Sequence, residues 1–148
     1  MTCLLLAVFL LSVGCGGGDD GAGSQDFAAS YNRTIERLTH VNAQLAQLQS
    51  SSRARSRTAI GREFDQFGDA LADTRADLSR LEPPDRAARQ FRALLAALDR
   101  SIAASRRAAA AARAIQPARQ RRAVRELRRA SRDVDSAQDA LGRAVARG

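Results

Sequence analysis

A dense run of arginines near the carboxyl end is the feature of this sequence with the clearest chemical potential. Segment 119–132 reads RQRRAVRELRRASR and holds seven arginines in fourteen residues. Such a concentration of positive charge attracts polyanions through electrostatic forces that salt screens. In an intracellular protein, nucleic acid would be the first partner to consider for it.

A helical interpretation divides these arginines into two sets. We take Val124 and Leu127 as the core-facing direction and step about 100° per residue. The most exposed stripe then contains Arg121, Arg125, Arg128 and Arg132, with Arg122 and Arg129 further round. An ordinary solvated helix face accounts for each of these residues singly. It does not account for their placement in the first half of the helix, because positive charge there opposes the helix macrodipole.

The patterns expected of an enzyme or a metal site are missing from the sequence. His40 is the only histidine, and no Glu-x-x-His pair, nucleophile elbow or phosphate-binding loop occurs. Aspartates at four-residue spacing do lie on common helix faces, and we interpret them as solvated polar faces. They are Asp69, Asp73 and Asp77, and then Asp135 and Asp139. We therefore predict a non-catalytic protein without a metal or other cofactor.

The first residues have the character of a secretion signal. Residues 1–14 carry no charge and contain the run CLLLAVFLLSV, which is too short to span a bilayer but suits the apolar core of a signal peptide. The run ends at LSVGC and is followed by GGGDDGAGS. Segment 16–24 is interpreted as a flexible tether, and Ser24 as the residue that caps the next helix.

The LSVGC segment resembles the lipobox of bacterial lipoproteins. The resemblance implies cleavage after Gly14 and acylation of Cys15, which anchors the protein to the outer face of the cell membrane. Ser12 stands where the pattern usually has Leu, and no basic residue precedes the apolar run. Cys3 leaves with the leader, so the mature chain has no internal disulfide. Secretion disfavours nucleic acid as the partner, as does the lack of aromatic residues near the arginines.

Four helical segments follow the tether. Apolar residues recur at steps of three and four, and the expected helices span 25–50, 58–82, 84–115 and 117–146. Pro83 and Pro84 separate the second helix from the third. Pro117 opens a fourth helix or kinks one long helix, and we favour the turn because a kinked helix would leave long apolar stripes uncovered.

These segments predict an all-α protein, an antiparallel up-and-down four-helix bundle. The alternative is an elongated three-helix coiled coil kinked at Pro117. The segment LEPPDRAARQFRALLAAL also resembles the alanine- and arginine-rich helical lipoproteins of GC-rich actinobacteria, a resemblance that implies no activity. All 24 basic residues are arginine, and 31 residues are alanine, so codon bias in a GC-rich genome remains a second explanation of the basicity.

An up-and-down bundle would gather positive charge at one end. Residues 50–66 and 105–129 hold thirteen arginines against three acidic residues, and both connections they contain would lie far from the tether. Arg53, Arg55 and Arg57 belong to this basic tip. The prediction is a membrane-tethered envelope protein whose tip binds an anionic wall polymer or an acidic partner. The alternative is a structural protein that associates through its apolar seams as a homo-oligomer.

Overall fold

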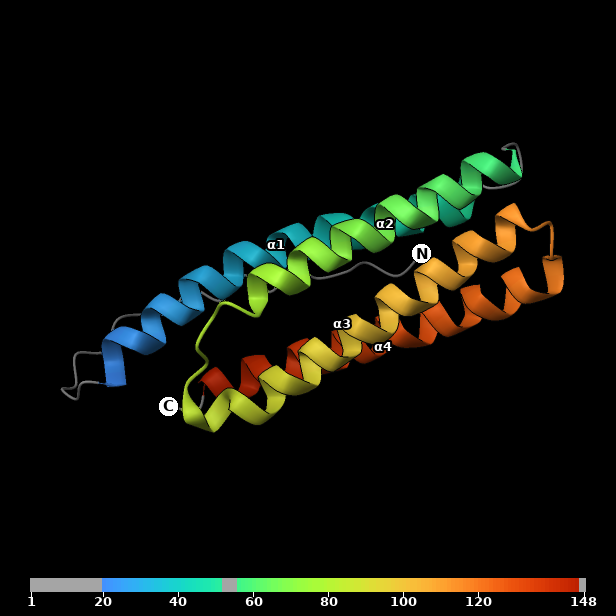
Figure 1. The fold of residues 1–148 in the computed structure, drawn as a ribbon. Helices are drawn as coiled ribbons and strands as arrows, with labels where there is room; N and C mark the ends of the chain where they lie inside the picture. Colours follow the sequence, from blue (N-terminus) through green and yellow to red (C-terminus); the bar gives the residue numbers. More distant parts are fainter. Residues whose placement is uncertain (1–19, 52–55, 147–148) are drawn as a thin grey trace.

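The computed structural model is an antiparallel bundle of four helices (Figure 1). It describes residues 20–51 and 56–146. The helices are α1 (Asp20–Ser51), α2 (Arg57–Leu78), α3 (Asp85–Arg113) and α4 (Pro117–Ala146). The predicted signal peptide, Cys15, Arg53 and Arg55 lie outside the described residues. None of the described helices combines the length and the apolarity needed to cross a membrane.

The helices alternate in direction, so their ends gather at two poles. The turn between α3 and α4 and the beginning of α2 lie at one pole, which we call the distal end (Figure 1). The beginning of α1, the connection from α2 to α3 and the carboxyl end of α4 lie at the other, the proximal end. The predicted four-helix architecture is confirmed, and α3 is its central element because it packs extensively on both α4 and α2.

Two predicted helix boundaries are wrong. Helix α1 begins at Asp20, so residues 20–24 of the predicted tether are helical and Ser24 lies inside the helix. An acidic residue such as Asp20 favours a helix start because negative charge there complements the macrodipole. Helix α2 ends at Leu78, four residues early, and Ser79 is its C-cap. Its end follows from Pro83, whose ring disfavours helical geometry in the residue before it.

The turn at Pro117 separates α3 from α4, so the kinked three-helix alternative is wrong. The Ile115 amide donates to the Ala112 carbonyl at 3.2 Å, and the Gln116 amide donates to the Ala111 carbonyl at 3.1 Å. This is a Schellman motif. Pro117 requires it, because proline disfavours helical geometry at Gln116 and then suits the first position of α4. Ile115 occupies the left-handed position, with φ of 54°.

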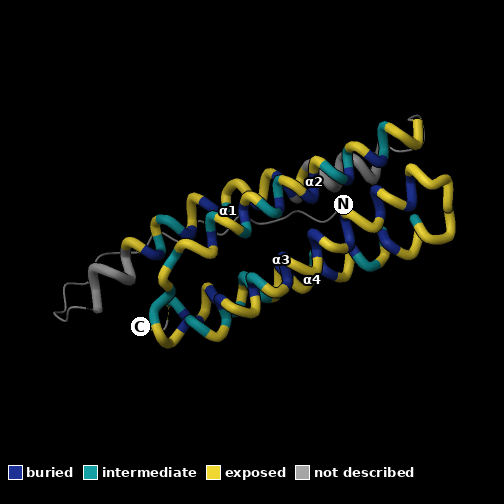
Figure 2. The backbone as a smooth tube through the Cα atoms, in the orientation of Figure 1, coloured by how far each residue is buried: buried dark blue, intermediate teal, exposed yellow. Residues whose placement is uncertain are grey.

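The core lies along the inner faces of the helices (Figure 2). In α2, the buried residues include Phe64, Phe67, Leu71, Thr74 and Leu78, which follow the three- and four-residue spacing. In α4, the buried face is rotated about the helix axis from the predicted direction of Val124 and Leu127, so that it includes alanines. Its members are Ala123, Leu127, Ala130, Val134, Leu141 and Ala144. The prediction followed the larger apolar residues, whereas small alanines let α4 approach α3 closely.

Small residues also bring α2 close to α3 in the distal half. A Cβ atom at Gly61 would stand 2.9 Å from the Arg113 Cγ and 3.4 Å from the Ala109 carbonyl oxygen. At Gly68, the nearest atom would be the Ser105 hydroxyl oxygen, at 3.4 Å. The buried Ser105 hydroxyl donates to the Phe64 carbonyl, which satisfies it across the two helices. Gly61 and Gly68 therefore permit the close approach of α2 to α3.

Candidate functional site

The distal end concentrates positive charge. Its described segments, residues 50–51, 56–66 and 105–129, contain eleven arginines and only Glu63, Asp65 and Glu126 as acidic residues. The beginning of α2 and the turn between α3 and α4 lie at this same pole (Figure 1). The charge polarity expected of an up-and-down bundle therefore follows from the observed fold.

Several arginines elsewhere in the bundle are held by carboxylates. Arg37 contacts Asp77 at 2.8 Å, joining α1 to α2. Arg75 contacts Asp99 at 3.0 Å, joining α2 to α3. Nearer the distal end, Arg113 pairs with Asp65. These pairs neutralise their arginines locally and join neighbouring helices, although exposed pairs contribute only about 0–1 kcal/mol each.

The arginines that begin α4 are densely spaced, and most have no partner among the described residues, as is also true of Arg86, Arg89 and Arg92 in α3. Arg128 alone in the run has a further interaction of its own. All the arginines of the run are exposed. Those without a described partner are Arg119, Arg121, Arg122, Arg125, Arg129 and Arg132. The predicted stripe is thus exposed as expected, and Arg57, the first residue of α2, is exposed as well.

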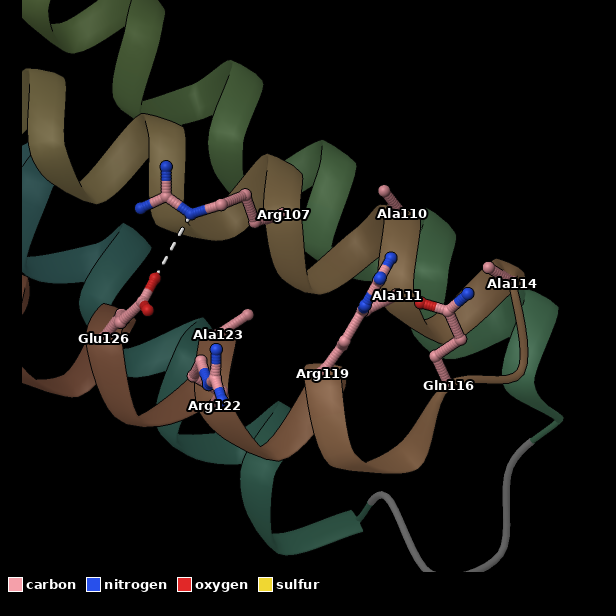
Figure 3. Close-up of a pocket in the computed structure, with 9 residues that line it drawn as sticks. All are labelled: Arg107, Ala110, Ala111, Ala114, Gln116, Arg119, Arg122, Ala123 and Glu126. Carbon is pink, nitrogen blue, oxygen red and sulfur yellow. Dashed lines mark hydrogen bonds and ion pairs between the residues drawn. The ribbon is translucent and has the colours of Figure 1, made fainter.

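A groove runs along the outer seam between α3 and α4 (Figure 3). It encloses about 750 Å³, and its apolar floor consists of alanines from both helices. The floor residues are Ala110, Ala111, Ala114 and Ala123. Arg119 reaches from α4 across the groove toward Ala111, and Gln116 lies at the end nearest the turn (Figure 3). Arg122 joins them on the α4 side.

The groove continues toward the proximal end past an ion pair. Arg107 contacts Glu126 at 3.2 Å and bridges the two helices. Beyond this bridge a second hollow of about 480 Å³ extends to Arg129 and to the pair of Arg100 and Asp133. Arg122 and Arg129 therefore line the seam, whereas the stripe faces away from it. The sequence placed these two arginines beside the stripe but did not predict the groove or the part that Arg107 and Arg119 have in it.

The exposed apolar surface of the described residues includes one large side chain at the distal tip. Ile115 is 66% exposed, and among the described residues it is the one large hydrophobic side chain that is exposed. It sits in the turn that follows the end of the groove, one residue from Gln116. No sequence pattern indicated it, because a β-branched residue is a poor choice for a left-handed position.

Two groups in the proximal half have raised pKa values. Partial desolvation, with the negative charge of Asp139 in addition, raises the pKa of the Asp135 carboxyl. Burial, again with Asp139, raises the pKa of the Tyr31 hydroxyl. His40 is exposed. The described residues contain no group of three or more His, Cys, Asp or Glu side chains arranged to hold a metal ion.

The described residues of the distal end therefore present an exposed basic surface. Guanidinium groups donate paired hydrogen bonds to phosphate and carboxylate oxygens, and Arg119, Arg121 and Arg122 have no carboxylate partner among the described residues. Neither a protein-family model, nor a curated protein, nor a solved structure matches this chain.

Proposed function

We propose that this protein is a non-catalytic envelope lipoprotein whose distal end binds a polyanion, an anionic wall polymer or an acidic partner. The observation that carries the proposal is the row of arginines in the first half of α4 that lack described carboxylate partners. Some arginines elsewhere, such as Arg37 and Arg75, pair with carboxylates of neighbouring helices, while others, such as Arg86, do not. Early α4 is distinguished by density: it gathers six arginines without a described partner within fourteen residues, which concentrates positive charge that an external anion can reach.

The cost of this arrangement to the helix supports the same interpretation. The first turn of α4 contains no acidic residue, and Arg119 stands in that turn, where the macrodipole disfavours a cation by about 0.3 to 1 kcal/mol. Codon bias explains the choice of arginine over lysine. It does not explain why the acidic residues of α4 other than Glu126 lie in the second half of the helix.

Binding of soluble polyphosphate tests the proposal. Replacing Arg119, Arg121 and Arg122 by glutamine removes three distal charges, and replacing Arg86, Arg89 and Arg92 by glutamine removes three exposed charges from the proximal end of α3. We expect the distal variant to lose at least tenfold in affinity and the proximal variant to lose much less. The slope of log Kd against log salt should fall by roughly one for each phosphate that the variant no longer neutralises. Equal losses in both variants would show that only net charge matters.

A second pair of variants separates the two arginine sets. One replaces the stripe residues Arg121, Arg125, Arg128 and Arg132 by glutamine, and the other replaces the seam residues Arg119, Arg122 and Arg129. A larger loss of affinity in the seam variant would place the polyanion in the groove between α3 and α4. A larger loss in the stripe variant would place it on the outer face of α4.

The anchor is tested separately by intact mass. In a host that processes lipoproteins, the proposal predicts a chain that begins at Cys15 and carries acyl groups, and Cys15→Ser should abolish both features. A full-length chain without added mass would remove the envelope location from the proposal. In that case nucleic acid would have to be reconsidered as the polyanion.

The apolar floor of the groove favours a second candidate, a structural protein that forms homo-oligomers. Ala96, Ala103 and Ala110 are exposed on α3 at seven-residue spacing, and helices with small residues at such positions approach one another closely. Light scattering after size exclusion distinguishes the candidates. An oligomer that persists at high salt and in the distal glutamine variant would favour the structural role.

A further inference from the structure

Ile115 is placed where folding alone would favour another residue. Its φ of 54° lies in the left-handed region, which glycine adopts without strain and a β-branched side chain adopts only at a cost. The motif itself requires the left-handed conformation, because the Ile115 and Gln116 amides bond back to the last turn of α3. Glycine or asparagine would close the same turn more easily.

The side chain gains nothing from the fold in return. It is 66% exposed, whereas most large apolar side chains of the described helices are packed against the core. Figure 2 draws the whole turn and the adjoining first turn of α4 as exposed. The strain and the exposure are independent observations. Both favour a contact between Ile115 and another molecule.

Charge surrounds this apolar residue. Arg119, Arg121 and Arg122 follow within seven residues on the first two turns of α4, and none has a partner among the described residues. Arg119 and Gln116 lie beside the turn at the end of the groove (Figure 3). The tip therefore presents one protruding aliphatic side chain within a set of cations.

The geometry points to an anionic lipid bilayer as the surface that this tip contacts, with Ile115 inserted between headgroups and the arginines on lipid phosphates. The inference rests on the proposed anion-binding role and names a partner for the same end. Because the proposed anchor at Cys15 would hold the opposite, proximal end, the bilayer that the tip contacts is one that faces the anchoring membrane. A phosphate polymer would use the arginines but leave Ile115 in water. A bilayer accepts a protruding side chain without a preformed pocket, and arginine stems adapt to the depth of the phosphates.

The absence of tryptophan from the chain allows a local test. Ile115→Trp in the full chain, made without acylation by Cys15→Ser, places a single fluorophore at the tip. Vesicles containing one third phosphatidylglycerol in phosphatidylcholine should shift its emission to the blue, and pure phosphatidylcholine vesicles should not. The matched control is Glu82→Trp in the same background, an exposed position in the proximal connection, whose emission should stay unchanged with both vesicles.

Two further measurements separate this inference from the proposed function. Adding Arg119→Gln, Arg121→Gln and Arg122→Gln to Ile115→Trp should raise the lipid concentration at half-maximal shift by roughly tenfold or more. Soluble polyphosphate should bind Ile115→Trp without a blue shift.

Binding of polyphosphate with no emission change on anionic vesicles would overturn the bilayer contact and leave the anion-binding role standing. Failure to bind either probe would overturn both. An equal blue shift at Glu82→Trp would show that contact is not specific to the tip, and would also overturn the inference.

Discussion

The two halves of the bundle are packed in different ways. The proximal half uses large side chains: the ring of Phe27 lies 5.6 Å from that of Phe91, edge to face, and 5.7 Å from that of Tyr31. Leu78 and Leu141 are fully buried near the same end. The distal half also buries Phe64 and Leu127, but its helices meet largely at glycine and alanine, including Gly61, Ala109 and Ala123, so that α2, α3 and α4 approach closely.

The charges divide along the same axis. Ion pairs join neighbouring helices at several levels of the bundle, and arginines without a described partner occur at both ends, but they are densest in the first half of α4 at the distal end. This difference indicates a division of labour. The proximal half supplies most of the hydrophobic stabilisation. The distal half presents charge and an exposed Ile115 on helices that pack through small residues.

The largest expected effect is a loss of core volume in the proximal half. Leu141 is fully buried, so Leu141→Ala should lower the free energy of unfolding by about 3 kcal/mol through reduced burial and a residual cavity. The distal counterpart Ile60→Ala, at a half-buried site, should lower it by about 1 kcal/mol. Urea denaturation measures both. An equal decrease at the two sites would remove the contrast in packing.

Enlarging a buried side chain should lower stability mainly in the distal half, whereas truncating one should lower it mainly in the proximal half. Ala109 is fully buried and its carbonyl lies against Gly61, so Ala109→Leu should cost about 2 kcal/mol by forcing α2 away from α3. The neighbouring Ala110→Leu lies on the exposed side and should change stability by about 0.5 kcal/mol or less. A tolerated Ala109→Leu would mean that the distal helices are not closely packed.

Ile115→Gly should increase stability. It removes the strain of a β-branched residue in the left-handed region, partly offset by the greater freedom of glycine in the unfolded chain, for a net gain of about 0.5 to 1 kcal/mol. Ile115→Ala keeps a Cβ atom and should gain less. Thermal unfolding followed by circular dichroism measures the difference, and a destabilised glycine variant would show that Ile115 has a packing role.

Arg121→Glu should also stabilise the isolated protein, by about 0.5 kcal/mol, because an acidic residue near the start of α4 complements the macrodipole. Arg125→Glu, one turn further along, should gain less because the effect falls off along the helix. Chemical denaturation at low salt resolves the pair. Destabilisation by Arg121→Glu would indicate that its charge serves the fold.

The smallest effect concerns pH at the proximal end. Because the folded state raises the pKa of Asp135, this carboxyl favours the native state below its unfolded pKa and loses that contribution as pH rises through its folded pKa. Asp135→Asn should therefore be slightly more stable than the parent at neutral pH, with no gain at acidic pH. Denaturation across the acidic to neutral range follows the difference. A gain that grows toward acidic pH would contradict it.

The sequence predicted the helices and their order because three- and four-residue periodicity and the prolines at 83, 84 and 117 are local signals. It also predicted the exposure of Arg121 and its stripe. It missed the burial of Ala123 and Ala130 and the groove beside them, because alanine carries little apolar signal and only tertiary packing selects its facing side. The left-handed Ile115 had no local signature at all.

The claim that the distal end is the binding end is tested most directly by nuclear magnetic resonance of the full-length chain titrated with polyphosphate. The signals to follow are the backbone amides and the arginine Nε–Hε groups. We predict shifts concentrated in residues 105–129 and at Arg57, with residues 86–100 and 133–146 nearly unchanged. Shifts spread evenly over both ends, or centred on the proximal arginines of α3, would contradict it.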